Sequence, residues 1–106
     1  MVNYIERDAA LVRECLPEGA EAPDDSDALF RIYAVLLRTR GSLTTASDVH
    51  DAWSAWMAGV DPGHKSIRPF SELDSATQAE DGPFLSAIRR AAERRSSSVQ
   101  DGHVEF

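Results

Sequence analysis

The chain has little cysteine and no long apolar run, and each of these two features excludes a class of protein. A single cysteine, Cys15, cannot form an intramolecular disulfide, so a secreted disulfide scaffold is excluded and a cytoplasmic compartment is expected. No stretch approaches the roughly 20 apolar residues that span a bilayer. Acidic residues also stand near the N-terminus, where a signal peptide would have a basic start. We therefore expect no membrane partner.

Positive charge is scarce as well. The formal net charge is −7, from 11 basic and 18 acidic side chains in 106 residues. Because nucleic-acid binding depends on neutralising phosphates, an acidic chain is a poor candidate for direct contact with nucleic acid. Lys65 is the only lysine beside ten arginines, a bias that is typical of the GC-rich genomes of actinobacteria and their phages.

The motifs that usually carry catalysis or bind metal are missing. The chain has no GxSxG elbow, no phosphate-binding glycine loop, no HExxH and no cysteine pair. Cys15 follows a predicted helix end, where the helix dipole disfavours a thiolate nucleophile. His50 and His64 could be drawn with Asp48 or Asp51 as a metal site, but their spacing does not support one. We expect no enzymatic activity, no cofactor and no metal.

Apolar residues recur at helical spacing in four segments, and no segment alternates as a strand does. The expected main helices cover residues 3–17, 27–40, 45–59 and 83–95. The sequence therefore predicts an all-α fold, a small bundle of four main helices with a long ordered loop before the last one. A single helical domain is expected over residues 1–95, followed by a flexible tail over residues 96–106.

Helix ends are marked by capping residues. Asn3 and Thr45 are the expected N-caps of the first and third helices, and Asp74 is the expected cap of a short turn over residues 75–79. Ser26 or Asp25 is expected to cap the second helix, and Gly41 to end it. The second helix has the strongest apolar face, formed by Leu29, Phe30, Tyr33, Leu36 and Leu37.

Charge is unevenly distributed along the chain. Residues 1–30 hold eight acids and two arginines, whereas residues 82–95 hold four arginines and one glutamate. One interpretation is that both faces are solvated or meet across the bundle. The other is that the arginine face, which includes Arg89 and Arg90, docks an anion or an acidic partner.

The second half of the chain carries a recognisable pattern. His50 and Trp53 form His-x-x-Trp. His64 then begins His-x-x-Ile-x-Pro-Phe-x-Glu-Leu, which ends at Leu73, and Asp81 precedes the last expected helix. Over residues 46–95 this pattern resembles the RyR domain, the repeat named after ryanodine receptors and also found in bacterial and phage proteins.

The resemblance implies a mainly helical fold that is used for interaction or ligand recognition rather than catalysis. Two departures stand out: Lys65 occupies a position where the family has proline, and the family's Gly-Trp-x-Tyr-Gly insert between Trp53 and His64 is absent. The whole chain is also similar to small uncharacterised proteins of actinobacteria and phages, a likeness that implies no function.

Several side chains are candidates for recognition. His50 and the indoles of Trp53 and Trp56 have a structural interpretation as core residues. The functional alternative is that His50 contacts His64 or a bound group and that one indole anchors an interface. The full set of candidate ligand- or partner-binding residues is His50, Trp53, Trp56, His64, Lys65, Arg68, Arg89 and Arg90.

Three functions compete. The first is a non-catalytic interaction module that binds a protein partner, or a second copy of itself, through the helix with the two indoles and the crossing over residues 64–73. The second is an RyR-like sensor or sponge for an anionic, nucleotide-type small ligand. Its expected contacts are His50, His64, Lys65, Arg68 and either Arg89 or Arg90. The third is an acidic mimic of DNA, against which the four arginines of residues 82–95 argue.

Overall fold

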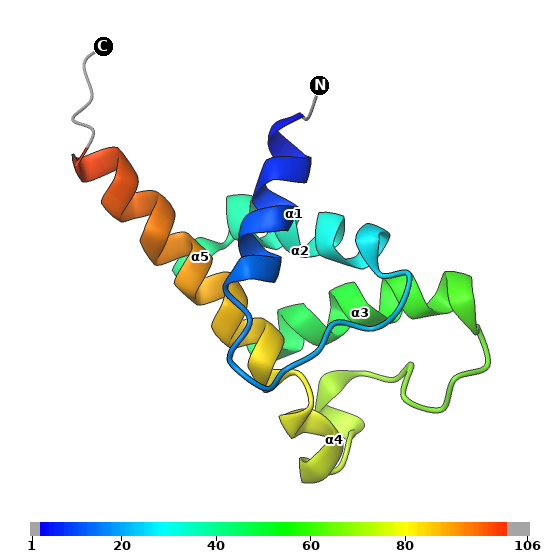
Figure 1. Cartoon of the computed structure of the whole chain (residues 1–106). Coiled ribbons are helices and arrows are strands. Elements are labelled where there is room, and N and C mark those ends of the chain that lie inside the picture. The colour runs from blue at the N-terminus through cyan, green and yellow to red at the C-terminus, as the bar shows by residue number, and fades with distance from the viewer. Residues whose placement is uncertain (1–2, 102–106) are drawn as a thin grey trace.

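The computed structural model describes the backbone of residues 3–101 and the side chains of residues 3–96 (Figure 1). These residues form helices and no strand, which confirms the predicted all-α fold. The main helices are α1 (Tyr4–Glu14), α2 (Asp27–Thr39), α3 (Ala46–Val60) and α5 (Gly82–Asp101). Shorter elements are the 3₁₀ turns η1 (Gly41–Leu43) and η2 (Phe70–Glu72) and the single-turn helix α4 (Ser75–Ala79).

Three helices begin where the sequence predicts a side-chain cap. The Asn3 side chain accepts a hydrogen bond from the backbone N–H three residues later at 2.8 Å. Asp74 does the same for Thr77 at 2.7 Å. Thr45 and Asp48 form a complete capping box, with bonds of 3.1 and 2.9 Å. These caps satisfy N–H groups that have no partner inside the helix, and so fix where each helix starts.

Of the other boundaries, the capping at the start of α2 and the end of α5 differ from the sequence prediction, and the end of α2 agrees with it. The Ser26 hydroxyl does not cap α2, because it donates instead to the Pro23 carbonyl at 2.6 Å. Gly41 follows α2 with φ of +54°, the left-handed conformation expected of a helix-ending glycine. Helix α5 continues to Asp101, beyond the expected end at residue 95, since no glycine or proline interrupts residues 84–101. The rest of the predicted tail, residues 102–106, lies outside the described residues.

The core forms around α2, which contacts α1, α3 and α5. In Figure 1, α5 runs diagonally beside α1, and the segment after α3 loops below the bundle to α4. Phe30, Tyr33 and Phe84 pack ring against ring, with centroids 5.4 to 6.3 Å apart. The fully buried side chains include Val12, Leu29, Phe30, Tyr33, Ala34, Val49, Ala87, Ile88 and Ala91. Burial of these apolar side chains is the main force that holds the helices together.

The acidic N-terminal region and the basic last helix meet in the structure. Asp8, 8% exposed, forms an ion pair with Arg38 of α2 and lies 3.9 Å from the Arg95 guanidinium of α5. Arg94 lies 3.9 Å from the Glu14 carboxylate. Part of the charge asymmetry of the sequence is thus balanced by ion pairs between helices of the same chain.

Candidate functional site

The segment between α3 and α4, residues 61–74, is laid across α3; we call it the strap. Its η2 turn contacts α3. The Gln78 side chain donates to the Phe70 carbonyl at 2.9 Å, and the bond ties the strap to α4. Pro69 has φ of −53° and ψ of 141°, so the chain enters η2 from extended backbone. The strap is therefore an ordered part of the fold, as the sequence predicts.

His50 connects α3 to the strap. The imidazole is 3% exposed, and its Nε2 lies 2.7 Å from the Arg68 carbonyl oxygen. Because a carbonyl can only accept, Nε2 must carry the proton and donate it. The ring stacks on Trp53 at 5.5 Å between centroids and packs against Phe70 at 6.2 Å. These contacts fix both the orientation and the tautomer of His50.

Asp81 faces the other nitrogen of this imidazole. Its Oδ2 lies 3.6 Å from Nδ1 of His50, and the residue is only 7% exposed. Burial raises the pKa of Asp81 to about 6, an effect that the His50 charge opposes and the neighbouring Glu80 charge reinforces. With Nε2 donating to the strap, Nδ1 is the nitrogen of His50 that faces the Asp81 carboxylate.

The arrangement superficially resembles a hydrolase triad, since the Ser54 hydroxyl lies 3.3 Å from Nε2 of His50. A triad serine must give its proton to a lone pair on that nitrogen. Here the nitrogen already carries the proton that it donates to Arg68, so no lone pair is available. Ser54 is also absent from the walls of the neighbouring cavity. The geometry thus does not activate Ser54 as a nucleophile.

A partly enclosed cavity of about 290 Å³ opens beside the pair of His50 and Asp81. Residues from α2, α3, the strap, α4, the start of α5 and the loop before α2 form its walls. The aromatic and aliphatic part consists of Leu29, Tyr33, Trp53 and Phe84. The ionisable part consists of Glu21, His50, His64, Glu80 and Asp81, and no lysine or arginine of the described residues joins them. The cavity therefore combines acidic side chains with aromatic ones.

Tyr33 places a free hydroxyl on this cavity. The residue is 1% exposed, yet its hydroxyl forms no hydrogen bond with the described residues. No fully sealed polar side-chain atom within the described part of the chain lacks a partner, so this oxygen must reach the open space of the cavity. Burial and the Asp81 charge raise the pKa of Tyr33 above its usual range. The hydroxyl therefore stays protonated and is available as a donor.

The structure brings three of the predicted candidates together. His50, Trp53 and His64 all line the cavity, and the rings of Trp53 and His64 meet edge to face at 5.1 Å. The His64 ring is oriented by a bond from the Ser66 backbone N–H to its Nδ1 at 3.0 Å.

The other candidates lie elsewhere. Trp56 is half-buried against the core, and Lys65 is exposed. The Arg68 side chain points to Glu72 at 3.6 Å, so Arg68 contributes to the site only through its carbonyl. Arg89 donates two bonds, of 3.1 and 2.8 Å, to the carbonyl of fully buried Thr44 and thereby holds η1 against α5. Arg90 is exposed on α5, away from the cavity.

Two residues with the strongest chemistry were missed as site candidates. The sequence places Tyr33 on the apolar face of its helix, and only the tertiary structure reveals that its hydroxyl opens on a cavity. Asp81 is part of the RyR-like pattern, but the sequence gives it no role in binding. The available signal was its position directly before the start of α5, where an aspartate usually caps the helix. Here its carboxylate faces His50 instead.

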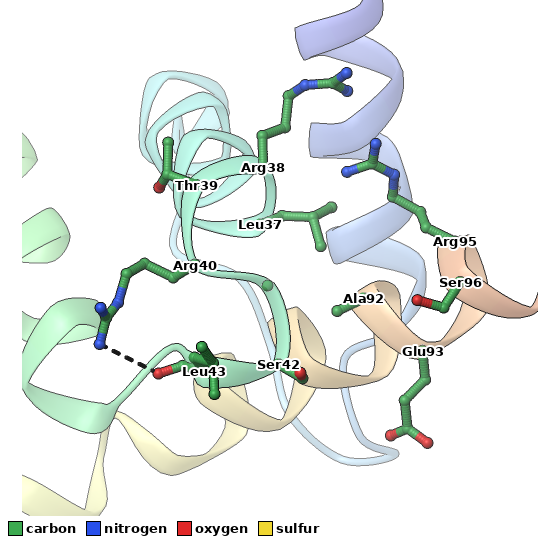
Figure 2. Close-up of a pocket in the computed structure, with 11 residues that line it drawn as sticks. Leu37, Arg38, Thr39, Arg40, Ser42, Leu43, Ala92, Glu93, Arg95 and Ser96 are labelled. Carbon is green, nitrogen blue, oxygen red and sulfur yellow. Dashed lines mark hydrogen bonds between the residues drawn. The ribbon is translucent and has the colours of Figure 1, made fainter. Parts of the chain in front are cut away.

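A larger hollow of about 780 Å³ lies between the end of α2, η1 and α5 (Figure 2). It is rich in arginine, but each guanidinium has an acidic partner. Arg38 and Arg95 share Asp8, while Arg40 binds Asp48 at 3.1 Å. Figure 2 also shows the bond from Arg40 to the Leu43 carbonyl, 3.4 Å long. These pairings leave little unbalanced charge to attract an anion.

Two further properties concern metals and membranes. Within residues 3–101, no three histidine, cysteine, aspartate or glutamate side chains are grouped so that they could hold a metal ion. Among the helices described, none combines the length and the apolar character needed to cross a membrane.

Comparison with known proteins places the chain in a family. The model of a domain of unknown function, DUF7701, matches residues 3–93, which include α1 to α4 and most of α5. The chain therefore belongs to this family. No curated protein and no solved structure matches it.

Proposed function

We propose that this protein is a non-catalytic binding module that takes a small ligand into the cavity beside His50 and Asp81. One observation carries the proposal: the Tyr33 hydroxyl and the Asp81 carboxylate face the cavity, and neither forms a side-chain hydrogen bond with the described residues. Because no sealed polar side-chain atom of the described residues lacks a partner, both groups reach the open space of the cavity and are available to bond a ligand there.

The size of the cavity supports a small ligand. Its volume of about 290 Å³ lies at the lower end of the range of roughly 300–1,000 Å³ seen for small-molecule sites. The mixture of aromatic walls with a few polar groups is also typical of such sites. A single-ring or small bicyclic molecule fits these limits.

The supporting contacts around the cavity favour recognition over chemistry. His50 is held by the Arg68 carbonyl on one side and by Trp53 on its face, so its role is to position Asp81 and the strap. The resemblance of residues 46–95 to the RyR domain supports the same kind of function, since it implies interaction or ligand recognition.

A mixed-charge fragment library observed by two-dimensional NMR tests the proposal. We expect hits that shift the Trp53 indole and the resonances of His50. Ser66→Phe would fill part of the cavity and abolish these shifts, whereas Ser47→Phe, at an exposed position on α3, would leave them intact. A library without any hit in the cavity, or hits that Ser66→Phe leaves unchanged, would refute the proposal.

A protein partner is the second candidate, because one end of the helix with the two indoles is exposed. Val60, the last residue of α3, is 61% exposed and lies next to the start of the strap. A partner that covered this end of α3 would bury the apolar surface of Val60. Light scattering would detect self-association, and Val60→Ser would reduce it if this end of α3 is the interface. A strict monomer at all concentrations would exclude a second copy as the partner.

A further inference from the structure

We infer that the ligand of this cavity is a planar organic cation of the amidinium or guanidinium type, which binds through the Asp81 carboxylate. The inference rests on the proposed function and specifies the chemical class of the ligand.

The first argument is charge. Glu21, Glu80 and Asp81 line the cavity, and no lysine or arginine of the described residues does. Lys65 is exposed, and Arg68 is held by Glu72. An anion would enter against the field of three carboxylates, whereas a cation would be attracted by it. The cavity therefore selects against the anionic nucleotides that the sequence alone suggested as ligands.

The second argument is hydrogen bonding. The Asp81 residue is only 7% exposed, and the distance from its carboxylate to Nδ1 of His50 is long, at 3.6 Å. A carboxylate can accept two parallel N–H bonds from an amidinium or guanidinium fork. Such a ligand brings both the donors and the positive charge that Asp81 lacks. The Tyr33 hydroxyl lies on the same cavity and can donate to an acceptor elsewhere on the ligand.

The third argument is shape. Tyr33, Trp53 and Phe84 contribute rings to the walls, and the volume is about 290 Å³. Flat cations gain from contact with aromatic rings as well as from burial. A compact, strongly hydrated ammonium would gain less in the same space.

Three probes of nearly equal shape separate charge from size: benzamidine, benzamide and benzoate. The Trp56→Phe variant leaves Trp53 as the single indole, so its fluorescence reports on the cavity. We expect benzamidine to bind at least about tenfold more tightly than benzamide, and benzoate not to bind up to about 10 mM. Asp81→Asn should weaken benzamidine at least about tenfold. The matched control Glu93→Gln, on the outer face of α5, should not change it.

The pH profile adds a second readout. Because burial raises the pKa of Asp81 to about 6, its carboxylate is mostly protonated at pH 5, and benzamidine should bind about tenfold more weakly there than at pH 8. The other titratable groups that line the cavity with Asp81 are His50, His64, Glu21 and Glu80. In Asp81→Asn this dependence should be strongly reduced.

Each other outcome overturns the inference. If benzamide or benzoate binds as tightly as benzamidine and Asp81→Asn abolishes the binding, the cavity is a ligand site but not a cation site. If benzamidine binds equally well to Asp81→Asn, it binds outside the cavity. If none of the three probes binds, the inference is wrong, and the fragment library with the Ser66→Phe variant decides separately whether the cavity binds any ligand.

Discussion

Replacement of Asp81 by asparagine should stabilise the protein near neutral pH. The pKa of Asp81 is raised from 3.8 to about 6 in the folded state, chiefly by burial. A raised pKa means that the folded state favours the protonated acid. Ionisation of the carboxylate therefore lowers the free energy of unfolding. This destabilisation grows as pH rises from about 4 to 6 and reaches its full value above about pH 6.

The expected magnitude follows from this shift. A difference of about two pKa units corresponds to roughly 3 kcal/mol, since each unit is 1.36 kcal/mol. Because the cavity admits water to the carboxylate, we expect a gain nearer to about 2 kcal/mol for Asp81→Asn at pH 8. The new side-chain amide can also donate to Nδ1 of His50, whose other nitrogen carries the proton given to Arg68.

Urea unfolding monitored by tryptophan fluorescence at pH 5, 6, 7 and 8 measures this effect. The advantage of the variant should shrink as pH falls from 8 to 5. Asp51→Asn, at an exposed position on the same helix as His50, should change stability by less than about 0.5 kcal/mol. If Asp81→Asn is less stable than the wild type at pH 8, the pair of His50 and Asp81 is a net stabilising ion pair and the reasoning is refuted.

Three other substitutions test the fold. Arg89→Ala removes both bonds to the buried Thr44 carbonyl and should lower the free energy of unfolding in urea by about 1–3 kcal/mol. The control Arg90→Ala should lower it by less than about 0.5 kcal/mol, and equal effects would contradict the assigned role of Arg89. Thr45→Ala breaks the capping box and should cost about 1 kcal/mol, with faster hydrogen exchange confined to the start of α3. Gly41→Ala should cost about 1 kcal/mol in thermal unfolding because φ is +54°, although the added carbon would meet no close neighbour; an unchanged Tm would show that the left-handed turn is not required.

The sequence predicted the helices well, because their signals are local. Apolar spacing and the caps at Asn3, Thr45 and Asp74 all lie within one or two turns of the helix that they define. The failure at Ser26 has a physical cause: its hydroxyl has two possible partners nearby, and the loop conformation favours the Pro23 carbonyl. Propensity alone cannot decide between such partners.

The site was predicted only in part, because its contacts join distant positions. His50 and His64 stand out by residue type, and the RyR-like spacing groups them. Tyr33 and Asp81, however, lie close together because α2 packs beside α5, and no short-range pattern in the sequence encodes this packing. Arg89 is a second case, since its position on a helix surface predicts ligand binding, whereas its two bonds to the Thr44 carbonyl depend on how α5 packs beside η1.

The cavity has a consequence for any attempt to isolate the second half of the chain. Residues 46–95 contain His50, Trp53, His64 and Asp81, but Tyr33 and Leu29 come from α2 and Glu21 from the loop before it. A fragment cut at residue 46 would lose one wall of the pocket together with the helix around which the core is built. The smallest unit that can be exchanged between proteins or grafted into a sensor with this cavity intact is therefore the whole bundle, not the motif.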